Sequence, residues 1–183
     1  MFKVEQLLEF IENYDKFLIF GIGNELVGDD GFGSLLIDNL KKEFSNSYLK
    51  KHSVILINSG SVPENFTGEI IKENPSHILI VDAFIRNEQS RIAEINNAQK
   101  IKNKVSGSIL NIDENEMSKY NFSTHSMSLS FLIKYLRDNI DFKVFILGSE
   151  AKSMNLGDNL TENIGNSLNQ LQNILIKTLK NME

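Results

Sequence analysis

Adjacent carboxylates follow a buried-strand pattern near the start of the chain. The apolar residues 17–20 run into a glycine-rich turn that carries Asp29 and Asp30 and ends at Gly33. A strand, a Gly-x-Gly turn and a helix form the layout of a phosphate-binding dinucleotide loop, where backbone N–H groups and the helix dipole attract an anion. Two carboxylates would repel a pyrophosphate, so this loop favours a cation or a polarised neutral group as its partner.

The glycine spacing also departs from the dinucleotide fingerprint. Leu26 stands at the third glycine position, and Asn58 replaces the acid that binds ribose after the second strand. Dinucleotide binding is therefore the weaker interpretation. For Asp29 the main alternative is a structural role as the cap of the following helix, because Asp is a favoured N-cap residue.

Two further candidates follow later apolar segments. Asp82 comes directly after the run 78–81, the pattern of a strand buried on both faces, and a carboxylate there needs a partner or caps the next element. His125 stands at the start of a predicted helix, where a lone histidine is more often a capped surface residue than a ligand. Because ligand sites of open parallel sheets lie beyond the carboxyl ends of the strands, we expect Asp30, Asp82 and His125 to face one crevice. Two carboxylates and a neutral imidazole could hold a divalent transition ion there.

Other catalytic chemistry has little support in the chain. His52 and His77 each precede a predicted strand, so we expect both at the opposite edge of the sheet in structural or solvated positions. The absence of cysteine from the sequence removes disulfides, thiolate metal sites and a cysteine nucleophile. No Gly-x-Ser-x-Gly nucleophile elbow occurs, which argues against a serine hydrolase.

Composition points to one globular domain covering residues 1–183. The chain is 41% hydrophobic and 23% charged, which is enough apolar content for a full core. Its net charge of -5 is mild and no basic stripe occurs, which argues against nucleic acid and anionic membranes as partners. The first residues lack a signal-peptide pattern, and no apolar run approaches membrane-spanning length, so a cytoplasmic protein is expected.

The periodicity of apolar residues predicts an α/β fold. We expect a three-layer sandwich with a mostly parallel, twisted sheet of about five strands and helices on both faces. The predicted helices cover residues 5–13, 33–44, 124–136 and 159–179, and the predicted strands cover 17–20, 54–57, 78–81 and 143–147, with 108–112 as a further strand.

Four motifs together resemble a known family. They are Gly21-x-Gly23-Asn24-x-Leu26-x-x-Asp29-Asp30-Gly31-x-Gly33, Gly60-Ser61-x-Pro63-Glu64-Asn65, Ile80-Val81-Asp82-Ala83 and Thr124-His125-x-Met127-x-Leu129. In this order they resemble the hydrogenase maturation endopeptidases, which trim the C-terminal tail of the large subunit of nickel-iron hydrogenases. The members that process group 3 and formate-hydrogenlyase type enzymes look closest.

The resemblance implies an aspartic-type, nickel-dependent hydrolase whose partner is a hydrogenase large-subunit precursor. Carried over residue by residue, Asp30 and Asp82 are its catalytic carboxylates, and Asp30, Asp82 and His125 contact nickel. Oxygen-rich ligand sets hold nickel less tightly than sets with several nitrogen or sulfur atoms, so the precursor is expected to supply the nickel. The alternative is a non-enzymatic, metal-dependent maturation chaperone or binding module that uses the same crevice. One departure stands out, because the family usually has Asp-Gly-Gly where this chain has Asn58-Ser59-Gly60.

Overall fold

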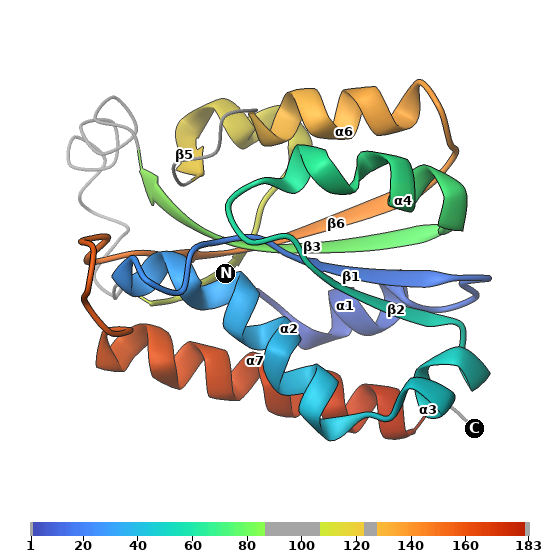
Figure 1. Ribbon diagram of the computed structural model, residues 1–183, viewed down its shortest axis with the longest axis horizontal. Helices are drawn as coiled ribbons and strands as arrows, with labels where there is room; N and C mark the ends of the chain where they lie inside the picture. The colour runs from blue at the N-terminus through green and yellow to red at the C-terminus, as the bar shows by residue number, and fades with distance from the viewer. Residues whose placement is uncertain (1, 87–106, 123–127, 182–183) are drawn as a thin grey trace.

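A mostly parallel sheet forms the centre of the molecule (Figure 1). The computed structural model describes residues 2–86, 107–122 and 128–181. Within them the strands are β1 (Phe17–Gly21), β2 (Val54–Asn58), β3 (His77–Arg86), β4 (Ile109–Asn111), β5 (Tyr120–Phe122) and β6 (Lys143–Glu150). Their order is β2-β1-β3-β6-β4, and β5 pairs with β3 outside this path. Strands β2, β1, β3 and β6 are parallel to one another, whereas β4 and β5 are antiparallel to their neighbours.

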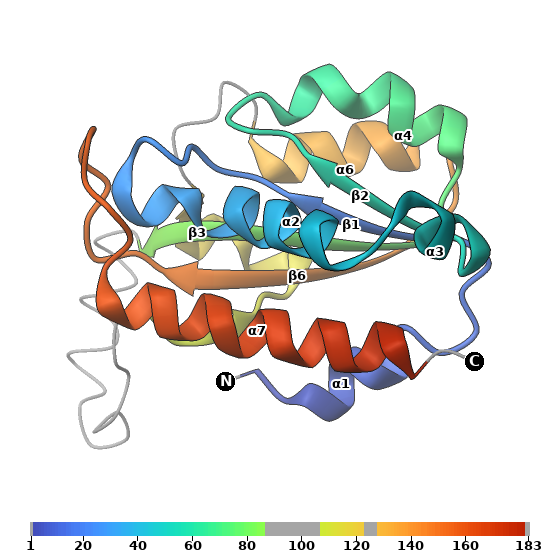
Figure 2. The ribbon, with the colours of Figure 1, turned by 60° about the horizontal axis from the view of Figure 1, so that its bottom comes forward.

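Helices cover both faces of this sheet (Figure 2). On one face lie α1 (Val4–Phe10), α2 (Phe32–Glu43), α3 (Asn46–Lys51) and α7 (Glu162–Lys180). On the other face lie α4 (Thr67–Glu73) and α6 (Leu129–Arg137). The predicted three-layer α/β sandwich is therefore confirmed. None of the helices in the described part of the chain has the length and apolar character needed to span a membrane.

The central strands bury side chains toward both helical layers. In β1, Ile19 joins the cluster under α2 and α7, while its neighbours Leu18 and Phe20 join the cluster under α4 and α6. This alternation follows from the two-residue period of a strand, and burial on both faces explains the unbroken apolar runs. Helix α7 buries one stripe at helical spacing, as its sequence predicts, made of Ile164, Leu168, Leu171, Leu175 and Leu179.

Several predicted boundaries differ from the structure. Strand β3 does not end at Val81 but runs to Arg86, because Ala83 and Phe84 are also buried and remain paired with β6. Asp82 therefore lies inside a strand, and the alternative that it caps the next element is wrong. Helix α6 begins at Leu129 with Ser128 as its N-cap, and the part of this helix predicted before Ser128 falls outside the described residues.

Candidate active site

Close contact between α2 and the sheet brings the acidic loop, the turn that carries Asp29 and Asp30, next to β3. A Cβ atom added at Gly33 would lie 2.2 Å from the carbonyl oxygen of Val81 and 2.3 Å from that of Ile22. Only glycine allows this approach, which presses the first turn of α2 against the strand. The Ile22 N–H also donates to the Val81 carbonyl at 2.9 Å. The 3₁₀ helix η1 (Gly28–Gly31), which carries Asp30, thus contacts the strand that carries Asp82.

Asp30 is fully buried, and its two carboxylate oxygens differ in their surroundings. Oδ2 accepts the backbone N–H of Asn24 at 2.9 Å. Oδ1 is also buried, but no described group donates a hydrogen bond to it. A buried polar atom without a partner costs about 1–3 kcal/mol, and more when it is charged. A cation placed at Oδ1 would remove that cost, so this atom fits a metal contact.

Asp82 is also a fully buried carboxylate, as are Asp29 and Asp30. Its Oδ1 accepts the N–H of Ala83 at 2.7 Å, which fixes the side chain against its own strand. Because side chains alternate along a strand, Asp82 lies on the same face of β3 as Ile80 and Phe84. That face is the one covered by α6, the helix that follows the predicted histidine.

The structure does not place His125, which lies outside the described residues. The described chain stops at Phe122 and resumes at Ser128. Phe122 pairs with Phe84, two residues beyond Asp82 on β3. Among the described residues, no group of three His, Cys, Asp or Glu side chains could hold a metal ion. Asp30 and Asp82 therefore do not form a complete metal site with the other described side chains.

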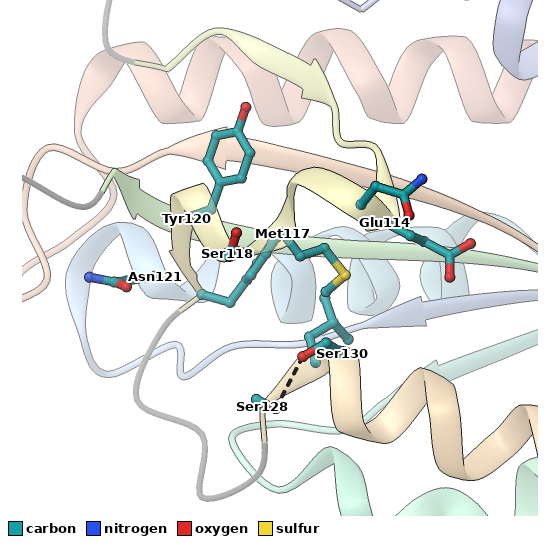
Figure 3. A pocket seen from close by; sticks show the side chains of 10 residues that line it. Glu114, Met117, Ser118, Tyr120, Asn121, Ser128 and Ser130 are labelled. Atoms are coloured by element: carbon teal, nitrogen blue, oxygen red, sulfur yellow. Dashed lines mark hydrogen bonds between the residues drawn. The ribbon is translucent and has the colours of Figure 1, made fainter. Parts of the chain in front are cut away.

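A cavity of about 630 Å³ lies between β5 and the first turn of α6 (Figure 3). Met117 and Leu129 supply apolar lining, and Ser118, Asn121 and Ser128 supply polar atoms. Phe122 and Ser128, the described residues on either side of the 123–127 segment, both line it. The cavity thus lies on the α6 side of β3.

Asp29 has a structural role that differs from the predicted helix cap. The residue before α2 is Gly31, and no side chain caps this helix. The Asp29 carboxylate instead accepts the Thr161 N–H at 2.7 Å and the Lys152 and Ser153 N–H groups at 2.8 and 3.0 Å. The Thr161 hydroxyl donates to it as well, at 3.1 Å. Asp29 therefore ties the acidic loop to the segment between β6 and α7.

The Asn58 amide, at the end of β2, both donates and accepts a hydrogen bond. Its Nδ2 donates to Oδ1 of Asp38 at 3.0 Å, and its Oδ1 accepts the N–H of Gly60 at 3.0 Å. Partial desolvation and the nearby Asp38 carboxylate raise the pKa of Glu25, while a hydrogen bond with Asn58 opposes the rise. An aspartate at position 58 would add a third carboxylate and lose the donor. Glu25 and Asp38 were not predicted as site residues, because Glu25 stands at an unspecified position of the first motif and Asp38 lies outside all four motifs.

The other two histidines lie at the edge where the strands begin, as predicted. His77 is the first residue of β3, and its ring meets that of Phe10 edge-on with centroids 5.1 Å apart. Burial lowers the pKa of His77, and Lys143 lowers it further, while Asp15 has the opposite effect. His52 is the C-cap of α3, and its ring centroid lies 4.5 Å from that of Tyr48. Neither residue belongs to the candidate site.

Solved structures of other proteins superpose on this fold. A [NiFe] hydrogenase maturation protease, HycI from Thermococcus kodakarensis, superposes with a TM-score of 0.74 at 23% identity, covering 96% of this chain and 99% of its own. The solution structure of the endopeptidase HycI from Escherichia coli gives a TM-score of 0.65 at 26% identity, with 86% of this chain and 87% of that one covered.

Sequence comparison identifies the family. No family model matches the chain. A protein of Escherichia coli named hydrogenase 3 maturation protease is 29% identical over 126 residues, which are 68% of this chain and 67% of that protein. A protein of Methanocaldococcus jannaschii named as a hydrogenase maturation protease is 34% identical over 182 residues, which are 98% of this chain and 97% of the relative. With this identity over nearly the whole of both chains, the protein belongs to the hydrogenase maturation proteases.

Proposed function

We propose that this protein is an endopeptidase that removes the C-terminal tail of a nickel-loaded nickel-iron hydrogenase large-subunit precursor. The observation that carries the proposal is the fully buried Asp30, whose Oδ1 has no hydrogen-bond donor among the described residues. Its segment contacts β3, which carries the buried Asp82. Two carboxylates shielded from water are costly unless a cation joins them.

The cation in this proposal is the nickel ion of the precursor, which is part of the substrate. Asp30, Asp82 and His125 would contact it, and two oxygen ligands with one imidazole nitrogen suit a divalent first-row metal. The Asn24 N–H holds Asp30 by Oδ2, which leaves Oδ1 for the ion. The Ala83 N–H donates to Oδ1 of Asp82 and holds this side chain against β3. The ion would mark the precursor as ready and supply positive charge beside the scissile carbonyl.

The assignment of catalytic roles to Asp30 and Asp82 makes this an aspartic-type peptidase in our proposal. Asp30 belongs to η1 and Asp82 to β3, and a backbone N–H donates to each carboxylate. Such anchoring keeps a reacting group in place without a reorganisation cost.

Intact-mass analysis of a precursor tests the proposal. The protein is incubated with nickel-loaded and nickel-free forms of a large-subunit precursor from the same organism. We expect loss of one C-terminal fragment from the loaded form only. A loaded precursor that binds the protein but keeps its full mass would contradict the endopeptidase assignment and favour a metal-dependent maturation chaperone.

A further inference from the structure

Two loops are joined by backbone hydrogen bonds next to the acidic site. We call residues 24–28 and 152–158 the two-loop platform. The N–H of Gly157 donates to the carbonyl of Leu26 at 2.8 Å, and the N–H of Gly28 donates to that of Asp158 at 3.2 Å. The buried Asp29 side chain adds its bonds to Lys152 and Ser153. The two loops are therefore held together as one surface.

This platform exposes apolar side chains. Leu156 is 80% exposed and Leu26 is 68% exposed, the two largest values among the large hydrophobic residues of the described chain. The Leu26 backbone is held at both ends, since its N–H donates to Oδ1 of Asn24 at 3.0 Å and its carbonyl accepts from Gly157. These bonds fix the backbone from which the exposed Leu26 side chain projects. Exposed apolar side chains that gather on one surface are a feature of sites that contact another polypeptide.

The platform is continuous with the candidate active site. Asn24 joins them, because its N–H donates to the Asp30 carboxylate while its side chain accepts from Leu26. Leu26 is therefore two hydrogen bonds away from the carboxylate that the proposed function places at the scissile bond. This continuity favours the cleaved polypeptide as the occupant of the platform.

We propose that Leu26 and Leu156 bind apolar side chains of the precursor polypeptide next to the bond that is cleaved. This inference rests on the proposed function and adds a determinant of substrate binding to it. Docking would cover both leucines, and each buried leucine side chain favours association because apolar area leaves water. Since the contact forms before the bond is cut and persists while it is cut, it contributes to binding rather than to the chemical step.

Steady-state cleavage of nickel-loaded precursor tests the inference. In a Leu26→Ser/Leu156→Ser double variant we expect KM to rise about ten-fold with kcat unchanged. Leu26→Met/Leu156→Met should keep the parent KM, because methionine preserves the apolar contact. Leu8→Ser is the matched control, since Leu8 is 41% exposed on α1, the helix whose Phe10 meets His77 at the opposite edge.

The outcomes separate this inference from the proposed function. If the parent protein trims the precursor and the serine double variant keeps the parent KM, the platform does not bind substrate. A double variant with raised KM whose methionine counterpart is equally impaired would also contradict it. If concentration-dependent dimers of the parent disappear in the serine double variant while KM stays unchanged, the platform binds a second copy instead. If the parent trims no precursor at all, the proposed function fails first.

Discussion

Asp82 accepts a backbone N–H from Ala83, which makes a conservative substitution informative. In Asp82→Asn the amide oxygen can still accept the Ala83 N–H seen at 2.7 Å, so the fold should persist. The neutral amide is a poorer metal ligand and cannot accept a proton, so we expect trimming of precursor to be lost. Circular dichroism and intact-mass kinetics check the two parts. Asp141→Asn, at an exposed position before β6, is the matched control. Trimming by Asp82→Asn at the parent rate would remove Asp82 from the reaction.

The adjacent residues Asp29 and Asp30 should respond in opposite ways. Asp29→Ala removes the acceptor for the Lys152, Ser153 and Thr161 N–H groups, so we expect a loss of about 2–4 kcal/mol in the free energy of unfolding. Asp30→Asn keeps an acceptor for Asn24 and removes a buried charge, so stability should change by less than about 1 kcal/mol while trimming is lost. Urea unfolding and cleavage assays distinguish them, and the reverse pattern would exchange the two roles.

His77 makes the stability of the protein depend on pH. Burial holds the pKa of His77 below its usual value of 6.5, so the unfolded chain binds a proton more readily than the folded one. The free energy of unfolding should therefore fall as the pH drops below about 6.5, until the folded protein also binds the proton. In His77→Gln this part of the slope should be absent. Urea titrations between pH 7 and pH 5 measure it, and an equal slope in both proteins would contradict the assignment.

Sequence motifs located the acidic residues but not all of their partners. Asp29 and Asp30 are the same residue type in the same loop. Asp29 binds the 152–161 segment, whereas Oδ1 of Asp30 has no donor among the described residues. The partners of Asp29 lie more than a hundred residues away in sequence, so no local pattern reports them. Chain spacing also cannot show whether two elements touch, which here depends on the close approach of Gly33 to Val81.

At the level of elements, long apolar patterns were sufficient and short segments were not. The core strands and α7 were predicted because each buries a regular set of residues. Helix α3 and strand β5 were missed, since six and three residues carry too little periodicity for a sequence-based assignment. The predicted end of β3 was wrong, because a charged residue rarely lies inside a buried strand.

The contact between α2 and β3 depends on one glycine. In Gly33→Ala the new Cβ would meet the backbone oxygens of Val81 and Ile22 at 2.2 and 2.3 Å, and neither can move independently of the sheet. We expect a loss of about 3 kcal/mol or more in unfolding free energy and a displaced acidic loop. Gly165→Ala, inside α7 with nothing within 4 Å of its Cβ, should instead stabilise the protein by about 0.5–1 kcal/mol. Thermal and urea unfolding compare the two variants, and equal stability would contradict the argument.

For the whole molecule, the proposed ligand set of two carboxylates and one imidazole predicts that nickel arrives with the precursor. The chain has no cysteine, and its described residues contain no group of three side chains suited to a metal. We therefore expect elemental analysis of the purified protein to show far less than one equivalent of nickel or zinc. Treatment with a chelator, followed by its removal, should leave trimming of loaded precursor unchanged. Stoichiometric tightly bound metal together with cleavage of nickel-free precursor would contradict this prediction.

A hydrogen bond and an ion pair hold the last turn of α7 near the edge of the sheet where the strands begin. The Tyr48 hydroxyl of α3 donates to the Leu179 carbonyl at 2.7 Å, and Lys180 pairs with Glu43. Glu43 is the final residue of α2, whose 12 residues span about 18 Å from the acidic loop. A protein tethered to a sensor surface through a linker after Lys180 would thus present its acidic loop and platform toward the solution. In this orientation the immobilised protein leaves room for a large folded precursor to approach. The precursor should not be the tethered partner through its C-terminal tail, because cleavage of that tail would release it.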